Sequence, residues 1–327
     1  MPFLSIKDLV VEYKSDNQIV HAVNGVSLEL EKGKTLGLVG ETGAGKTTIA
    51  KSILRILPDV GSKIVSGEIQ LEGTDLLQCP ESDMRAIRGN KVSMIFQDPM
   101  TALNPVQKVG EQIAEVVRLH NDSHVDAEKR AKEMLEIVGI PAERYSEYPH
   151  QFSGGMKQRV VIAIALACNP DLLLADEPTT ALDVTIQAQV MDLIKDLQNK
   201  YQTAMLLITH DMGVVAQVCD EVAVIYAGSI LEYGTKEQIF DHPTHPYTIG
   251  LFNSIPSMSE DEEWLHPIEG LPPDPTDLPK GCPFSPRCKY AIEECKQKPI
   301  GVHMTKDGHQ CRCCRLDLIG KEKEGKV

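Results

Sequence analysis

Nine consecutive residues carry the clearest chemistry in this sequence, because their types and spacing fit a loop that binds phosphate. The loop consists of Gly40, Glu41, Thr42, Gly43, Ala44, Gly45, Lys46, Thr47 and Thr48, and it fits the pattern G-x-x-x-x-G-K-[ST]. Its glycines allow backbone N–H groups to close around an anion. Lys46 is placed to reach the β- and γ-phosphates of a nucleotide, and the Thr47 hydroxyl is placed to bind Mg²⁺.

Carboxylates that could act on the bound phosphate follow an apolar run at residues 172–175. Asp176 is placed to support Mg²⁺, and Glu177 is placed to polarise a water molecule for in-line attack. His210 follows a similar run at residues 205–208, where its ring could hold the phosphate and the water together. Gln97 follows residues 92–96 and could coordinate Mg²⁺ or the attacking water. Taken alone, such a glutamine is more often a surface residue, and a lone histidine is usually structural.

A second anion site is indicated where a helix begins. Ser153, Gly154, Gly155 and Met156 precede a helical run at residues 160–168, and a helix N-terminus with exposed N–H groups attracts anions. The alternative is an ordinary serine N-cap with a flexible entry. Two such helix starts in one chain indicate either two ligands or one ligand that is shared between two copies of the chain.

The elements that position these residues alternate between strands and helices. A short strand at residues 35–39 precedes the loop, and a helix at residues 48–57 follows it and stops at Pro58. The remaining predicted strands are residues 3–13, 19–32, 66–72, 92–96, 172–177, 205–208, 222–226 and 229–233, and the remaining predicted helices lie within residues 109–139 and 184–199. The first two strands predict a small antiparallel sheet. Tyr13 ends the first of them, where it is either a base-stacking aromatic or an ordinary strand-end tyrosine.

Composition restricts the classes of function. The chain has 327 residues and a formal net charge of −14, and an acidic surface disfavours nucleic acid as a partner. No apolar run reaches the ~20 residues that span a bilayer, and no signal peptide opens the sequence. We therefore expect a cytoplasmic protein whose membrane association comes through a partner.

The cysteines are concentrated near the end of the chain. Six of the nine lie between Cys282 and Cys314, after a proline-rich stretch. Thiols stay reduced in the cytosol, so this cluster predicts a metal site before disulfides. The six are Cys282, Cys288, Cys295, Cys311, Cys313 and Cys314; the first three are separated by five and by six residues, unlike the close pairs of zinc fingers. Four such thiolates could hold a [4Fe–4S] cluster.

Together these motifs resemble the nucleotide-binding subunit of an ABC transporter, over about residues 3–250. The resemblance implies an α/β fold, with a RecA-like P-loop NTPase core, an N-terminal antiparallel β subdomain, a helical signature subdomain and a C-terminal cysteine-rich extension. It implies that ATP is the nucleotide, that Tyr13 stacks on adenine and that Gln97 begins the loop that senses the membrane partner. Residues 153–156 would then be the signature motif, which contacts the γ-phosphate on the opposite subunit, and Asp183 would lie in the loop at the dimer interface. Phe152 and Met156 depart from the usual leucine and glutamine of that motif, at positions that do not supply the anion-binding backbone.

Three further segments are similar to the ATPase subunits of bacterial dipeptide and oligopeptide importers, and nickel importers share much of the pattern. These segments are His245-Pro246-Tyr247-Thr248, residues 152–159 and residues 281–288. The resemblance implies a second, identical or related ATPase subunit, two membrane permease subunits, an extracytoplasmic peptide-binding protein, and a place at the cytoplasmic face of the membrane. It also favours the [4Fe–4S] cluster on Cys282, Cys288, Cys295 and Cys313, with Cys311 or Cys314 as an alternative fourth ligand and Zn²⁺ as the alternative metal.

The expected organisation is an ATP-binding domain at residues 1–250, with its helical subdomain at about 98–160, and an extension at 251–327. Two other classes compete with a transport ATPase. A soluble ABC-type ATPase of ribosomes or DNA usually has two nucleotide domains or a long coiled-coil insertion, and this sequence has one P-loop and no sustained heptads. A redox protein built on the cysteines would leave the first 250 residues unexplained.

Overall fold

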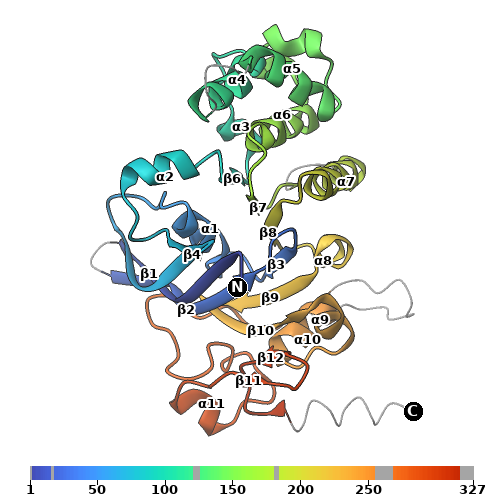
Figure 1. Ribbon diagram of the computed structural model, residues 1–327. Coiled ribbons are helices and arrows are strands. Elements are labelled where there is room, and N and C mark those ends of the chain that lie inside the picture. Colours follow the sequence, from blue (N-terminus) through green and yellow to red (C-terminus); the bar gives the residue numbers. More distant parts are fainter. Residues whose placement is uncertain (1, 16–17, 121–125, 180–183, 255–267, 317–327) are drawn as a thin grey trace.

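The computed structural model describes residues 2–15, 18–120, 126–179, 184–254 and 268–316. Their strands form two sheets, and helices pack around the larger sheet (Figure 1). This arrangement confirms the predicted α/β class, with an antiparallel β subdomain at the N-terminal end and a helical layer at the far end from the last strands.

The N-terminal sheet is antiparallel and has the strand order β2-β1-β4-β5. Its strands are β1 (Leu4–Ser15), β2 (Gln18–Leu30), β4 (Ser62–Leu71) and β5 (Thr74–Asp75). On β1, Leu4 and Ile6 are buried, and so are Leu9 and Val11 after an irregularity that shifts the strand register. They form one core with the facing side of the larger sheet. Residues 3–13 and 19–32 were therefore correctly predicted as strands, to within about two residues at each end.

The larger sheet has the order β11-β12-β10-β9-β3-β8-β7-β6. Five of its strands run parallel: β3 (Thr35–Val39), β6 (Val92–Ile95), β7 (Leu172–Asp176), β8 (Ala204–Thr209) and β9 (Glu221–Tyr226). Strand β10 (Ser229–Thr235) pairs antiparallel with β9. The carboxyl ends of β3, β7 and β8 thus share one edge, which is where the predicted reactive residues follow their strands.

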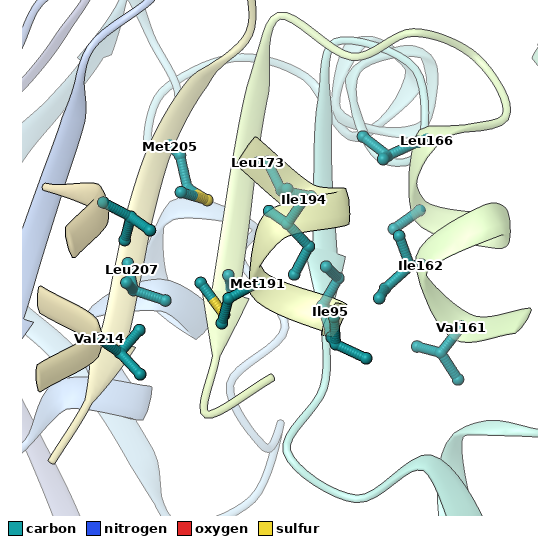
Figure 2. Close-up of a cluster of buried hydrophobic side chains, with 14 of the residues drawn as sticks. Ile95, Val161, Ile162, Leu166, Leu173, Met191, Ile194, Met205, Leu207 and Val214 are labelled. Carbon is teal, nitrogen blue, oxygen red and sulfur yellow. The ribbon is translucent and has the colours of Figure 1, made fainter. Parts of the chain in front are cut away.

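Both faces of this sheet are covered, which explains the continuous apolar runs in its strands. In β8, Met205 and Leu207 face the core that contains the helices, whereas Leu206 and Ile208 face the N-terminal sheet. Figure 2 shows the helical side, where α6 (Gly154–Leu166), α7 (Val184–Tyr201) and α8 (Met212–Val218) lay apolar residues over β7 and β8. Burial on both sides fixes the positions of the strand ends.

The helix after the P-loop is shorter than the sequence predicts. Helix α1 spans Lys46–Ile53, and Leu54 caps it. Arg55 has a φ of 51°, in the left-handed region that interrupts a helix. Its guanidinium donates to the carbonyl oxygens of Leu76 and Cys79, and these bonds hold the turn beside α2 (Glu81–Ile87). A tertiary contact therefore ends the helix before Pro58 can.

The helical layer consists of α3 (Pro99–Ala102), α4 (Val109–His120), α5 (Ala127–Ile137) and α6, with two 3-10 turns at Ala142–Ser146 and Pro149–Gln151. Its amphipathic helices bury Ile113, Val117, Met134 and Leu135 against one another. The layer lies at one end of the molecule, away from α1 (Figure 1). The domain limits at residues 98, 160 and 250 stay predictions.

The C-terminal segment is joined to the larger sheet, which the sequence did not predict. After α9 (Lys236–Asp241) and α10 (Pro246–Asn253), the chain continues through α11 (Glu293–Gln297) to β11 (His303–Met304) and β12 (Gln310–Cys311). Strand β12 pairs with β10, with Cys311 opposite Glu232. Backbone hydrogen bonds therefore hold residues 303–311 on the larger sheet.

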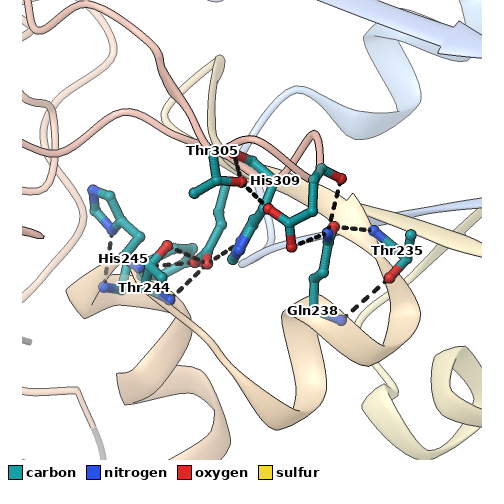
Figure 3. Close-up of polar contacts among 9 residues, drawn as sticks. Thr235, Gln238, Thr244, His245, Thr305 and His309 are labelled. Atoms are coloured by element: carbon teal, nitrogen blue, oxygen red, sulfur yellow. Dashed lines mark hydrogen bonds and ion pairs between the residues drawn. The ribbon is translucent and has the colours of Figure 1, made fainter. Parts of the chain in front are cut away.

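A buried carboxylate reinforces this attachment. Glu232, on β10, is 1% exposed and accepts hydrogen bonds from the Thr244 N–H (2.6 Å), the Thr244 hydroxyl (2.7 Å) and the His245 N–H (2.9 Å). Its Oε1 atom also lies 2.8 Å from Nε2 of His309, beside β12 (Figure 3). Burial alone would raise the pKa of the Glu232 carboxyl group, but the hydrogen bonds from these donors have a larger combined effect and lower it.

Within the described ranges, none of the helices combines the length and apolar character needed to cross a bilayer.

Candidate active site

The P-loop adopts a conformation that depends on its glycines. Gly45 precedes α1 with a φ of 99°, in the left-handed region that favours glycine. A Cβ atom there would collide with the carbonyl oxygen of Ala22 on β2, and one at Gly40 would collide with that of Ile225 on β9. The loop is thus enclosed by strands from both sheets, and its N–H groups lead into the positive end of α1.

Lys46 lies inside this loop. Its side chain is buried, and its ammonium group donates to the carbonyl oxygens of Gly40 (2.7 Å) and Glu41 (3.0 Å). Burial lowers the pKa of Lys46, against the opposing attraction of Glu177, Asp176 and Glu41. The lysine is therefore positioned by its own loop, facing the acidic strand ends.

Thr47 and Asp176 form the next pair. The Thr47 hydroxyl donates to Oδ1 of Asp176 over 3.1 Å, which joins the start of α1 to the end of β7. Asp176 is 2% exposed, and burial raises the pKa of its carboxyl group. A hydroxyl and a carboxylate at this spacing fit Mg²⁺, which takes few protein oxygens and fills its remaining positions with water and phosphate. When bound, the ion would neutralise charge on the phosphates.

Glu177 is held in a strained conformation directly after β7. Its φ is 45°, which is unusual for a residue other than glycine, and its N–H donates to the carbonyl oxygen of Ile208 over 2.8 Å. Its two carboxylate oxygens have different partners: Oε2 accepts from the Gln97 amide (2.9 Å), and Oε1 lies 3.2 Å from Nδ1 of His210. The structure thus brings Gln97, Glu177 and His210 together from the ends of three strands.

Comparisons with known proteins agree with this geometry. Residues 23–180 match the ABC transporter family, and residues 231–295 match the C-terminal region of oligopeptide/dipeptide transporters. The chain is 50% identical to the oligopeptide transport ATP-binding protein OppD of Haemophilus influenzae, over 96% of this chain and 97% of that one. It is 49% identical to the dipeptide transport ATP-binding protein DppD of Bacillus subtilis, over 96% and 95%.

The chain belongs to the ABC transporter ATP-binding family.

The same result follows from solved structures. A dimeric ATP-binding cassette in a post-hydrolysis state with ADP and Pi superposes with a TM-score of 0.64 at 26% identity, over 71% of this chain and 98% of that one. The protein cbiO1 of Clostridium perfringens, part of the ABC transporter complex cbiONQ, gives a TM-score of 0.63 at 25% identity, over 74% of this chain and 91% of that one. The resemblance deduced from the sequence is confirmed, and the chain is an ABC-type ATPase.

Other predicted residues of this ABC ATPase lie around or away from the P-loop. The Tyr13 hydroxyl is 3.2 Å from the Thr48 hydroxyl, so this tyrosine borders the loop. Ser153 caps α6 by accepting from the Met156 N–H (3.4 Å), in the helical layer. Gly155 packs so closely that a Cβ atom would lie 2.8 Å from Ile186 on α7. Asp183 lies outside the described residues. The assigned roles of all these residues stay predictions.

The predicted [4Fe–4S] cluster is wrong. In residues 268–316 and the rest of the described chain, no three His, Cys, Asp or Glu side chains are arranged to hold a metal ion, so the Zn²⁺ alternative has no site either. All nine cysteines are free thiols. Cys282 and Cys295 are part of the main hydrophobic core, whereas Cys311 and Cys313 pack in a separate cluster beside Ile249 and Leu316. Burial raises the pKa of the Cys282 thiol to about 12. The burial of these cysteines is typical of small apolar residues, and the segment is held by strand pairing together with the contacts of Glu232 and Arg287.

Two residues that contact the P-loop were not predicted from the sequence as site residues. Tyr247 Oη accepts from the Glu41 N–H over 3.0 Å, and Arg287 forms an ion pair with the Glu41 carboxylate at 2.8 Å. Both lie in segments that were noted only for their family resemblance, residues 245–248 and 281–288. The tyrosine and the arginine in these segments were visible in the sequence, but no sequence pattern indicated that both contact Glu41.

Proposed function

We propose that this ABC ATPase drives the import of dipeptides or oligopeptides across the cytoplasmic membrane. The observation that supports the cargo is the identity of about 50% to oligopeptide and dipeptide transport proteins over nearly the whole chain. That similarity extends into the C-terminal region, which matches a segment described for peptide transporters. A likeness confined to the P-loop half would support ATP hydrolysis alone.

In the proposed mechanism, the P-loop N–H groups and Lys46 bind the phosphates of ATP, and Tyr13 stacks on adenine. Thr47 and Asp176 would hold Mg²⁺, and Gln97 would supply a further oxygen ligand. Glu177 polarises the attacking water, and its orientation is maintained by the Gln97 amide and the His210 ring. His210 is largely exposed at its edge of the sheet, so it is free to contact the γ-phosphate.

The site is completed by a second ATPase subunit in this proposal. Ser153, Gly154, Gly155 and Met156 lie at the start of α6, in the layer remote from α1 (Figure 1). Their N–H groups would meet the γ-phosphate that the P-loop of the partner subunit holds, and Asp183 would lie at the interface. A dimer is also the state of the similar cassette with ADP and Pi.

Mixing two inactive variants tests this arrangement. Lys46→Ala should lose phosphate binding, and Ser153→Glu should repel phosphate from the signature motif. Each variant alone should hydrolyse little ATP, but a mixture should regain activity, because one composite site then combines an intact P-loop with an intact Ser153. Steady-state ATPase assays across protein concentrations provide the measurement.

If the natural partner is a related subunit, activity should appear only when that subunit is added. Full activity of a strictly monomeric wild-type sample, or no recovery in any mixture, would exclude a shared site.

Reconstitution tests the transport function. The chain would be assembled with two permease subunits and a related ATPase subunit in proteoliposomes, with the binding protein outside. We expect a dipeptide or oligopeptide on the binding protein to stimulate ATP hydrolysis severalfold and to enter the lumen. Stimulation by nickel but not by peptides would instead show a nickel importer. Co-purification with ribosomes or DNA and not with permeases would contradict the transport function.

A further inference from the structure

Glu41 is the second residue of the P-loop, and the C-terminal half of the chain holds it at both its backbone and its side chain. Its N–H donates to the buried hydroxyl of Tyr247, on α10. Its carboxylate oxygens accept from Nη1 of Arg287 at 3.0 and 2.8 Å. Its carbonyl oxygen accepts from Lys46, at 3.0 Å. Glu41 therefore links Arg287 to the lysine that is assigned to phosphate binding.

Arg287 is fixed by more contacts than a surface ion pair provides. Its side chain is 6% exposed. Its Nη1 atom also donates to the Tyr226 hydroxyl (3.2 Å), Nη2 donates to the Ile268 carbonyl (3.1 Å), and Nε donates to the Glu269 carbonyl (3.0 Å). All three guanidinium nitrogens have acceptors, so the planar group is held in one orientation.

The aromatic residues around this pair come from separate parts of the fold. Tyr226 ends β9, Tyr247 lies on α10, and Phe284 precedes Arg287 in the C-terminal segment. Their ring centroids are 4.6 to 5.4 Å apart. This aromatic cluster adjoins the Arg287–Glu41 pair, because the Tyr226 hydroxyl accepts from Arg287 and the Tyr247 hydroxyl accepts from the Glu41 N–H.

We propose that Arg287 is a positioning residue for ATP binding. Arg287 neutralises Glu41 and fixes the P-loop, so that the C-terminal segment sets the affinity of the site for MgATP. This inference rests on the ATP-binding roles proposed above. Arg287 touches Glu41 and not the reacting atoms, so it acts through the loop.

The physical reason is the charge of Glu41. A carboxylate within the phosphate-binding loop repels the phosphates of ATP unless a cation compensates it, and at an effective dielectric constant of about 20 such a repulsion is substantial over several ångströms. Arg287 supplies this cation through its ion pair with the Glu41 carboxylate. It also restrains the Glu41 carbonyl that positions Lys46. Loss of Arg287 should therefore weaken ground-state binding of MgATP more than it slows the chemical step.

The full chain, with its partner subunit where hydrolysis needs one, is assayed for KM and kcat with MgATP. Arg287→Ala should raise the KM by about tenfold or more, with a smaller change in kcat, because Glu177 and His210 are untouched. Arg287→Lys keeps the positive charge but lacks the planar guanidinium group with its several donors, and it should give an intermediate KM. The double variant Arg287→Ala/Glu41→Gln should recover most of the lost affinity, since the uncompensated carboxylate is gone. Lys296→Ala is the matched control: it removes another cation of the same segment, one that pairs with Glu293 at the surface, and should leave the KM unchanged.

A wild-type KM for Arg287→Ala, or a double variant no better than Arg287→Ala alone, would overturn the inference; the second result would indicate that Arg287 only stabilises the fold. If Arg287→Ala does not fold, Arg287→Gln replaces it in the same double-variant comparison. These outcomes are distinct from failure of the proposed function, in which the wild-type chain with its partner would neither bind nor hydrolyse ATP.

Discussion

Replacing Glu177 with glutamine should lower kcat for ATP hydrolysis by a factor of about 10² to 10⁴, the usual effect of losing one general base. Binding of MgATP should persist, because the P-loop, Thr47 and Asp176 are unchanged. The strained backbone at Glu177 and the two partners of its carboxylate hold the reactive oxygens in one orientation. The amide of glutamine has the same shape, but it cannot polarise water in the same way. The variant should therefore accumulate with ATP bound, as a closed dimer.

Single-turnover hydrolysis measures the loss of catalysis, and nucleotide retention on gel filtration measures the persistence of ATP binding. Glu133→Gln is the matched control, since Glu133 is an exposed carboxylate on α5 that pairs only loosely with Arg130 at 3.7 Å. Its turnover should equal that of the wild type. Wild-type turnover by Glu177→Gln would show that another group activates the water.

Replacing Glu232 with alanine should lower the free energy of unfolding by about 3 to 5 kcal/mol, the typical cost of breaking a buried charged network by removing one partner. Two backbone N–H groups, a hydroxyl and the His309 ring would lose their common acceptor. The pairing of β12 with β10 would weaken with them, because Glu232 and Cys311 are opposite each other. The C-terminal segment should then detach more often than the rest of the fold.

Chemical denaturation gives the overall stability, and the rate at which a thiol reagent modifies Cys311 reports on the detachment, because that thiol is buried in the native fold. Glu237→Ala on the exposed side of α9 serves as the control and should change neither quantity, since its carboxylate is 68% exposed. Unchanged stability and thiol protection in Glu232→Ala would mean that strand pairing alone holds the segment.

Local sequence patterns determined most of the ATP-binding core. The apolar runs before Asp176 and Thr209 predicted buried strands, and the position of a residue at the carboxyl end of such a strand predicted that it meets ligand. The P-loop pattern predicted a backbone conformation that only glycine permits at Gly45. For these features the physical cause lies within about ten residues of the feature itself, so the sequence contains it.

The attachment of the C-terminal segment could not be predicted from local sequence patterns. Cysteine spacing predicted a metal cluster, but spacing along a chain does not fix the arrangement of the side chains, and in the described residues no three His, Cys, Asp or Glu side chains are arranged to hold a metal ion. What attaches the segment is the pairing of β12 with β10 and the donors around Glu232, which come from three separate stretches of chain.

The sequence by itself determined that the chain binds a nucleotide, which strands present the reactive residues, and to which family the chain belongs. Only the tertiary structure decided which distant residues support the site. Glu41 and Arg287 are 246 residues apart, and neither has a local pattern that marks the other. They meet because the sheet places β9 beside β3, and because α10 and the C-terminal segment then pack their aromatic rings against the end of β9. A charge pair of this kind depends on the packing of the whole chain, and its energy depends on burial, which no local pattern specifies.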